Sequence, residues 1–151
     1  MEGFFMIPGL KVRELRDEDI EEVVRIHGVI TKKPDPPVVE ALLRENLEKS
    51  RGVGFVAELE GRVVGFMMGE IKHGSFGLGR SFWIEMMAVH PKRMGIGIGH
   101  AIGERLFEFC KSKDVFDVYT AVRWDSGDIL SFFKTLGFDR SNFVNLRKKL
   151  E

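Results

Sequence analysis

The sequence lacks the features that mark several specialised classes of protein. Its single cysteine, Cys110, has no partner for an intramolecular disulfide and rules out a cysteine-rich zinc site. Basic and acidic residues number 23 each, so the formal net charge is zero and the overall positive charge of a dedicated nucleic-acid binder is missing. No apolar run approaches the ~20 residues that cross a bilayer. We therefore expect a cytoplasmic protein that works without a metal, a nucleic acid or a membrane, and a homodimer is left open.

What is present is the pattern of one folded domain. A chain of 151 residues with 44% hydrophobic composition has the size and apolar content of one globular unit, so we expect a single domain over residues 1–151. Strand-like and helix-like periodicities alternate, and Glu60-Gly61 gives a two-residue hairpin signal. Gly28 is expected to be the end or a weak point of the first helix, and Pro34, Pro36 and Pro37 to break the chain after it. The order predicts an α/β chain with a mixed sheet. The expected strands are 11–15, 53–59, 62–71, 82–89, 115–122 and 143–150, and the expected helices are 17–28, 38–50, 98–110 and 126–136.

Three alternating glycines, Gly95, Gly97 and Gly99, lead directly into the third expected helix. Because glycine has no side chain, several backbone N–H groups can point into one hollow there, and the helix N-terminus adds partial positive charge. Such a loop suits a phosphate or pyrophosphate, and a merely flexible loop is the alternative. His100 stands where a P-loop needs lysine, and the glycine spacing fails the dinucleotide fingerprint, so the common nucleotide-binding loops do not fit.

The same stretch resembles the acetyl-CoA signature of the GNAT family of N-acetyltransferases. That signature is R/Q-x-x-G-x-G/A after a strand ending in V-x-P. Here Val89-His-Pro91 is followed by Met94-Gly-Ile-Gly-Ile-Gly99. The order of the expected elements is that of the family, and Leu136-Gly-Phe138 is similar to its late LGF turn. The resemblance covers the whole chain.

The resemblance implies a fold and a reaction. The implied fold is a mixed central sheet of about six to seven strands with about four helices. The implied reaction is direct transfer of an acetyl group from acetyl-CoA, a co-substrate, to a primary amine, which is a protein N-terminus, a lysine or a small amine. The implied CoA contacts come from the strand end, the glycine loop and two later positions: Met87, Ala88, Val89, Arg93, Met94, Gly95, Ile96, Gly97, Ile98, Gly99, His100, Ser126 and Phe133.

Glu85 is the candidate for the catalytic base. An alkylammonium has a pKa of about 10.4, so an amine acceptor must lose a proton before attack, and a carboxylate can take it directly or through water. Glu85 lies inside an apolar strand, where a charged side chain is costly unless it is solvated, paired or used. The two-residue strand period predicts that it shares a face with Met87 and Val89. The alternative is a strand carboxylate that faces solvent.

Three positions depart from the family pattern. Met94 stands at the Arg/Gln position, with Arg93 one residue earlier, and Ser126 stands where the family often has Asn. Phe133 replaces a frequent tyrosine and cannot donate a proton to a departing thiolate. Tyr119, the only tyrosine, is then the one phenolic candidate for a general acid, although packing within its strand is the stronger interpretation. These departures support an alternative function, a non-catalytic acyl-CoA-binding or regulatory module, against which the intact Gly97-x-Gly99 and Glu85 argue.

Overall fold

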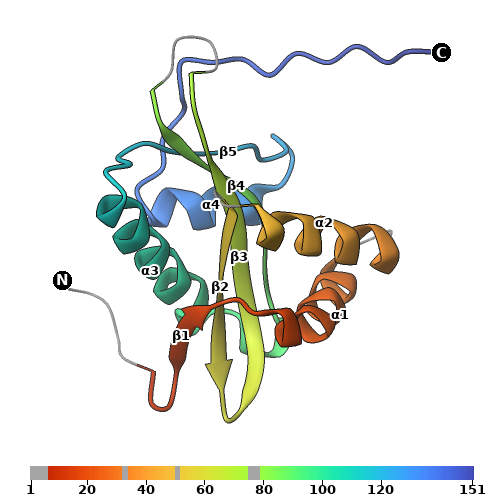
Figure 1. The fold of residues 1–151 in the computed structure, drawn as a ribbon, viewed down its shortest axis with the longest axis vertical. Helices are drawn as coiled ribbons and strands as arrows, with labels where there is room; N and C mark the ends of the chain where they lie inside the picture. Colours follow the sequence, from red (N-terminus) through yellow and green to blue (C-terminus); the bar gives the residue numbers. More distant parts are fainter. Residues whose placement is uncertain (1–6, 32–33, 50–51, 75–78) are drawn as a thin grey trace. The chain divides into compact units, whose positions relative to one another are not determined.

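The computed structural model describes residues 7–31, 34–49, 52–74 and 79–151, in two units, Met1–Ala121 and Val122–Glu151. The first unit contains a mixed β-sheet and helices α1 to α3, and the second contains helix α4 (Gly127–Thr135). Figure 1 shows these elements coloured along the chain. The expectation of one domain over residues 1–151 stays a prediction.

Five strands form one sheet whose spatial order follows the chain. They are β1 (Lys11–Glu14), β2 (Gly52–Leu59), β3 (Arg62–Lys72), β4 (Ser81–Val89) and β5 (Val118–Thr120). The first three neighbouring pairs are antiparallel, and β4 and β5 are parallel. Glu60 and Gly61 turn the chain between β2 and β3 with φ of 54° and 77°, so the predicted hairpin is confirmed. The parallel pair needs a crossover, which helix α3 supplies.

Helices cover both faces of the sheet in the first unit (Figure 1). A 3-10 turn, η1 (Asp17–Asp19), leads into α1 (Ile20–Ile30), and α1 and α2 (Pro36–Glu48) share one face. Helix α3 (Ile98–Ser112) lies on the other face, where the Phe109 ring meets the rings of Phe55 and Phe82 edge-on. The core beneath α1 and α2 is built from buried apolar side chains: Leu15, Ile20, Val23, Ile26, Val39, Leu43, Val56, Phe66 and Met68.

An ion pair fastens β1 to the start of the first helix. Arg13 donates two hydrogen bonds to the Asp19 carboxylate, at 2.8 and 2.9 Å, and the Arg16 backbone N–H donates a third at 2.8 Å. Burial by itself raises the pKa of Asp19, but these bonds and the Arg13 charge outweigh it, so the pKa is lowered overall. Asp19 is therefore a buried carboxylate held in its charged form.

The second unit is organised by α4 and the turn after it. Phe133 is buried, and its ring contacts those of Phe132 and Phe138 at centroid distances of 5.2 and 5.0 Å. Gly137 adopts a left-handed φ of 93°, and the Phe138 backbone N–H returns to the Phe133 carbonyl at 3.0 Å. This is a glycine-terminated helix end, which explains the Leu-Gly-Phe sequence there.

The α/β class and the mixed sheet are confirmed, but the sheet has five strands in the described residues rather than six to seven. The expected strand 143–150 is wrong: its residues are not in strand conformation and pair with no strand of the described residues, and Val144 and Leu146 are 82% and 87% exposed. The expected strand 115–122 shortens to β5. Side-chain alternation suggested both, but a strand exists only where its backbone finds a partner.

The first two helices also begin and end differently from expectation. Helix α1 runs through Gly28 to Ile30 instead of ending at the glycine. The chain leaves the helical conformation after Ile30, as expected, but Pro36 and Pro37 already form the first turn of α2, with Asp35 as N-cap. Proline suits this position because the first turn of a helix needs no N–H donor.

Candidate active site

A β-bulge interrupts strand β4 at Glu85. Met86 pairs with Met68 of β3, and Ile84 pairs with Gly69, so Glu85 is the extra residue between two paired positions. A bulge breaks the regular alternation of side chains and turns one of them in a new direction. Bulges are frequent beside active sites for this reason.

Gly69 and Asn46 hold the backbone around the bulge. A Cβ atom at residue 69 would lie 1.9 Å from the carbonyl oxygen of Trp83, so the close approach of β3 to β4 requires glycine. The buried Asn46 of α2 donates a hydrogen bond from Nδ2 to the Gly69 carbonyl at 3.0 Å. This bond ties α2 to the strand pair at the bulge.

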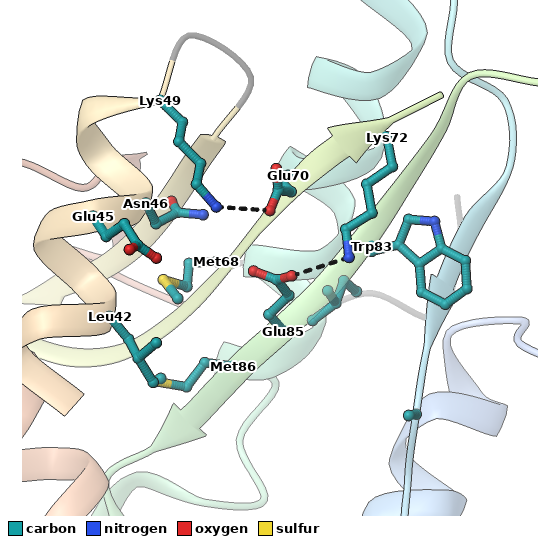
Figure 2. A pocket seen from close by; sticks show the side chains of 12 residues that line it. Leu42, Glu45, Asn46, Lys49, Met68, Glu70, Lys72, Trp83, Glu85 and Met86 are labelled. Atoms are coloured by element: carbon teal, nitrogen blue, oxygen red, sulfur yellow. Dashed lines mark hydrogen bonds and ion pairs between the residues drawn. The ribbon is translucent and has the colours of Figure 1, made fainter. Parts of the chain in front are cut away.

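The bulge changes the face on which Glu85 lies. The two-residue period predicted a face shared with Met87 and Val89, and that expectation is wrong. Glu85 lines a pocket together with its neighbour Met86, whereas Met87 pairs with Met67 outside that lining. One extra residue shifts the alternation by one position. Glu85 therefore points toward α2 (Figure 2).

The pocket lies between α2 and the paired strands β3 and β4 and has a volume of about 420 Å³ (Figure 2). Its apolar part is formed by Leu42, Met68 and Met86, and its charged part by Glu45, Lys49, Glu70, Lys72 and Glu85. We call this the α2 pocket. Three carboxylates against two ammonium groups leave it one negative charge in excess, which favours a cationic guest.

Two lysine–glutamate ion pairs line the α2 pocket. Lys49 Nζ lies 3.1 Å from Glu70 Oε1, and Lys72 Nζ lies 3.4 Å from Glu85 Oε2 (Figure 2). Glu70 is nearly buried, and its hydrogen bond and charge raise the pKa of Lys49, with a smaller contribution from Glu45 and Glu85. Glu85 is 36% exposed and Lys72 41%, so their pair remains open to water and to a ligand.

Trp83 connects this ion pair to Tyr119. The Lys72 ammonium lies 5.5 Å from the centroid of the Trp83 ring, a cation–π contact. The Tyr119 ring stacks on the same indole at 4.8 Å with an interplanar angle of 21°, because β5 pairs Tyr119 with Trp83. The two sequence-predicted catalytic residues, Glu85 and Tyr119, thus belong to one chain of contacts.

The glycine loop has the backbone geometry of an anion site. Gly95 and Gly97 have left-handed φ values of 82° and 97°, and Gly97 is the N-cap of α3. Chain neighbours aside, no heavy atom of the described residues lies within 4 Å of a Cβ built at residue 95, and a Cβ built at residue 97 meets Ile7 at 3.9 Å. The first amides of a helix have no partner within the helix and carry partial positive charge. The residues present therefore fit a pyrophosphate.

Some side chains of the glycine loop are exposed, and others are buried or paired with neighbouring residues. Met94 and Ile96 are exposed, whereas Ile98 is buried and belongs to the packing beneath α3. Arg93, at the end of the 3-10 turn η3 (Pro91–Arg93), pairs with Glu60 of the hairpin turn at 3.2 Å. His90 accepts a hydrogen bond from the Lys92 backbone N–H at 3.1 Å. Arg93 could replace the Arg or Gln that the family has at the position of Met94, but its guanidinium is already paired with Glu60.

The strand before the loop has an open edge. Strands β4 and β5 pair only from Phe82 to Ile84 of β4. In the described part of the chain, residues 85–89 of β4 therefore have a strand partner on the β3 side alone. Met87, Ala88 and Val89 lie on this stretch, where backbone groups can serve a ligand that approaches from the β5 side.

Ser126 and Phe133 belong to the second unit. Ser126 is the N-cap of α4 without a side-chain capping bond, and Phe133 is packed among aromatic rings. Contact of either residue with CoA stays a prediction.

Cys110 and His27 are poorly placed to act as reactive groups. Cys110 is buried in α3, and burial raises the pKa of its thiol to about 11. Burial lowers the pKa of His27, whose ring lies beside the Thr31 hydroxyl at 3.3 Å. Among the described residues, no group of three or more His, Cys, Asp or Glu side chains could hold a metal ion. No helix in the same residues is long and apolar enough to cross a membrane.

The residue pattern alone missed most of the α2 pocket. Asn46, Lys49, Glu70 and Lys72 were not predicted as site residues, although Glu70 and Lys72 are charged positions at the end of an apolar strand. Antiparallel pairing of β3 with β4 could have pointed to Glu70 and Lys72, because it places Glu70 beside Trp83.

The chain matches the model of the acetyltransferase (GNAT) family over residues 14–138. Solved structures share the fold. The aminoglycoside N-acetyltransferase AAC(6')-Iy in complex with CoA is 15% identical, with a TM-score of 0.83 over 95% of this chain and 99% of that one. The aminoglycoside antibiotic 6'-N-acetyltransferase AAC(6')-Ih from Acinetobacter baumannii is 11% identical, with a TM-score of 0.80 over 95% and 100%. A transcriptional regulator from Bacillus halodurans C-125 is 18% identical, with a TM-score of 0.78 over 93% and 99%.

Proposed function

Because the chain belongs to the acetyltransferase (GNAT) family, we propose that it transfers the acetyl group of acetyl-CoA to a primary amine bound in the α2 pocket, with Glu85 as the base. Acetyltransferase activity and acetyl-CoA as donor follow from the family. The acceptor and the roles of individual residues are the proposal.

One observation carries the choice of a primary amine. The Glu85 carboxylate already holds an alkylammonium group, that of Lys72, which also lies against the Trp83 ring. A carboxylate beside an aromatic face is a favourable environment for an amine cation. The pocket of about 420 Å³ can admit a lysine side chain, a protein N-terminus or a small amine.

Glu85 is suited to remove the proton that blocks attack. An alkylammonium with a pKa of about 10.4 is almost wholly protonated at neutral pH, so the nucleophile must be released from it. A carboxylate at the pocket surface can accept this proton and pass it to water, a contribution of about 10²–10⁴-fold. The bulge supports this role, because it turns Glu85 into the pocket.

The glycine loop is suited to hold the donor. Gly95 and Gly97 adopt left-handed backbone conformations and lie exposed at the N-terminus of α3, a position that suits the pyrophosphate of CoA. The open edge of residues 85–89 can supply backbone N–H groups to the thioester end. Acetyl-CoA, when bound, supplies the activated acetyl group.

Tyr119 is assigned a packing role rather than a catalytic one. Its ring stacks on Trp83, which fixes the indole beside the Lys72–Glu85 pair. A thiol has a pKa of about 8.5, so the thiolate can leave and be protonated by water.

The test is release of CoA thiol from acetyl-CoA across a panel of primary amines that includes alkylamines, amino acids and peptides. We expect amine-dependent release with at least one acceptor, and an acetylated amine that mass spectrometry identifies. If the protein binds CoA in calorimetry but no amine stimulates thiol release, the proposal fails and the alternative of a non-catalytic acyl-CoA-binding module is supported.

A further inference from the structure

Lys72 places an alkylammonium group inside the α2 pocket, at the carboxylate to which we assign the role of base. Its Nζ lies 3.4 Å from Glu85 Oε2 and 5.5 Å from the centroid of the Trp83 ring. An external amine acceptor would need the same two contacts, a carboxylate for its proton and an aromatic face for its cation. Lys72 therefore has the chemistry of an acceptor and lies at the proposed base.

We propose that Lys72 is itself acetylated by this chain when no other acceptor fills the pocket. The inference rests on the proposed function, since it uses the same donor and the same base. Glu85 takes a proton from the Lys72 ammonium, and Nζ then forms a bond to the acetyl carbonyl carbon while the C–S bond of the thioester breaks. The nitrogen loses a second proton as the amide forms, and the departing sulfur takes up a proton to leave as CoA thiol.

Lys49 offers a comparison within the same pocket. Its partner Glu70 is only 10% exposed, whereas the partner of Lys72, Glu85, is 36% exposed. Acetylation of Lys49 would leave a nearly buried carboxylate without its counter-charge, which is costly. Acetylation of Lys72 leaves Glu85 in contact with water, where losing an ion pair costs little. The structure thus favours Lys72 over Lys49 as the modified residue.

The direct test is a time course of the protein with acetyl-CoA alone, in which peptide mass spectrometry follows acetylation of each lysine. We expect Lys72 to be labelled at least about 100-fold faster than the exposed Lys92, the lower end of what a general base contributes. The rate should not depend on protein concentration, since acceptor and site belong to one chain. Labelling of Lys72 no faster than that of Lys92 would overturn the proposal.

Matched variants separate catalysis from chemical acetylation. Lys72→Arg keeps the charge but removes the acetylatable amine, so the fast phase should vanish. Lys111→Arg makes the same change at an exposed position of α3 outside the pocket lining and should retain it. Glu85→Gln should slow Lys72 labelling by about 100-fold and leave Lys92 unchanged. Labelling of Lys72 that is indifferent to Glu85→Gln would also overturn the proposal.

A binding experiment without acetyl-CoA tests whether Lys72 occupies the acceptor position. In a Trp124→Phe background, Trp83 is the remaining tryptophan and its emission reports on the pocket. We expect Lys72→Met to bind n-butylammonium at least about tenfold more tightly than Lys49→Met, because only the first change vacates the site beside Glu85 and Trp83. Equal binding by the two variants would contradict the assignment.

The failure of this inference differs from the failure of the proposed function. Amine-dependent thiol release by a protein whose Lys72 stays unmodified would overturn self-acetylation alone. Absence of thiol release with every amine, and of Lys72 labelling, in a protein that binds CoA would overturn both.

Discussion

Replacement of Gly69 by alanine tests the bulge that presents Glu85. The new Cβ atom would lie 1.9 Å from the Trp83 carbonyl oxygen and 2.8 Å from Cε1 of Phe82, whereas ordinary contacts begin at 3.4 Å. The carbonyl would have to retreat by about 1.5 Å, the difference between 3.4 Å and 1.9 Å, in a tightly packed strand pair. Such overpacking against backbone should lower the free energy of unfolding by about 3 kcal/mol.

Gly65→Ala is the matched control in the same strand. Its Cβ atom would lie 3.2 Å from the side-chain tips of Ile98 and Ile102 and 3.3 Å from the Ala88 carbonyl oxygen, so small movements can admit it. We expect a cost below about 1 kcal/mol.

Urea denaturation followed by circular dichroism measures both variants. A loss of 3 kcal/mol moves the midpoint of Gly69→Ala down by about 1–3 M at an m-value of about 1–3 kcal/mol/M. Gly65→Ala should stay near the wild type. If Gly69→Ala unfolds at the wild-type midpoint, the bulge is not fixed by glycine and the assigned direction of Glu85 is refuted.

Three further predictions concern the loop, the tyrosine and the first ion pair. Gly97→Val should weaken CoA binding in calorimetry by at least about tenfold. Gly61→Val, which changes a left-handed glycine in the hairpin turn, should leave the affinity unchanged. Equal affinities of the two variants would refute the loop as the pyrophosphate site. Tyr119→Phe keeps the stack on Trp83 and should change kcat by less than about threefold, and a hundredfold loss at unchanged CoA affinity would make Tyr119 the general acid. Asp19→Ala should cost about 3 kcal/mol at neutral pH, because Arg13 loses its two hydrogen bonds to Asp19 and is left with Glu58 at 3.6 Å, and the Arg16 N–H loses its acceptor. Since the folded pKa of Asp19 is lowered, this contribution is present above a pH of about 3.9 and is lost as the pH falls through the lowered value. A difference in stability between the wild type and Asp19→Ala that persists in acid would contradict the assignment.

The order of elements and the donor loop could be predicted from the sequence because they depend on local patterns. Glu60-Gly61 specifies a tight hairpin, and Gly95 and Gly97 occupy backbone conformations that other residues avoid. The predicted family resemblance is confirmed by the match over residues 14–138. Such signals need no knowledge of which segments meet in space.

The α2 pocket could not be predicted because it depends on register and tertiary contacts. The bulge at Glu85 exists only relative to β3, and a single-strand period therefore placed Glu85 on the wrong face. Asn46 lies in α2 and Lys49 is its C-cap, and the sequence of this helix shows only an amphipathic pattern. The final expected strand failed for a related reason, since the alternation in 143–150 says nothing about a pairing partner.

The pH dependence of amine-dependent thiol release by Glu85→Gln, measured beside Glu45→Gln, tests the central claim most directly. Both changes remove one carboxylate charge from the α2 pocket, but only the first removes the proposed base. We predict that Glu85→Gln lowers kcat/KM by about 100-fold at neutral pH and that the deficit shrinks as the pH approaches the amine pKa of about 10.4, where free amine forms without help. Glu45→Gln should stay within about threefold of the wild type at every pH. Full turnover by Glu85→Gln across the pH range would contradict the account and leave Glu85 a carboxylate that merely faces solvent.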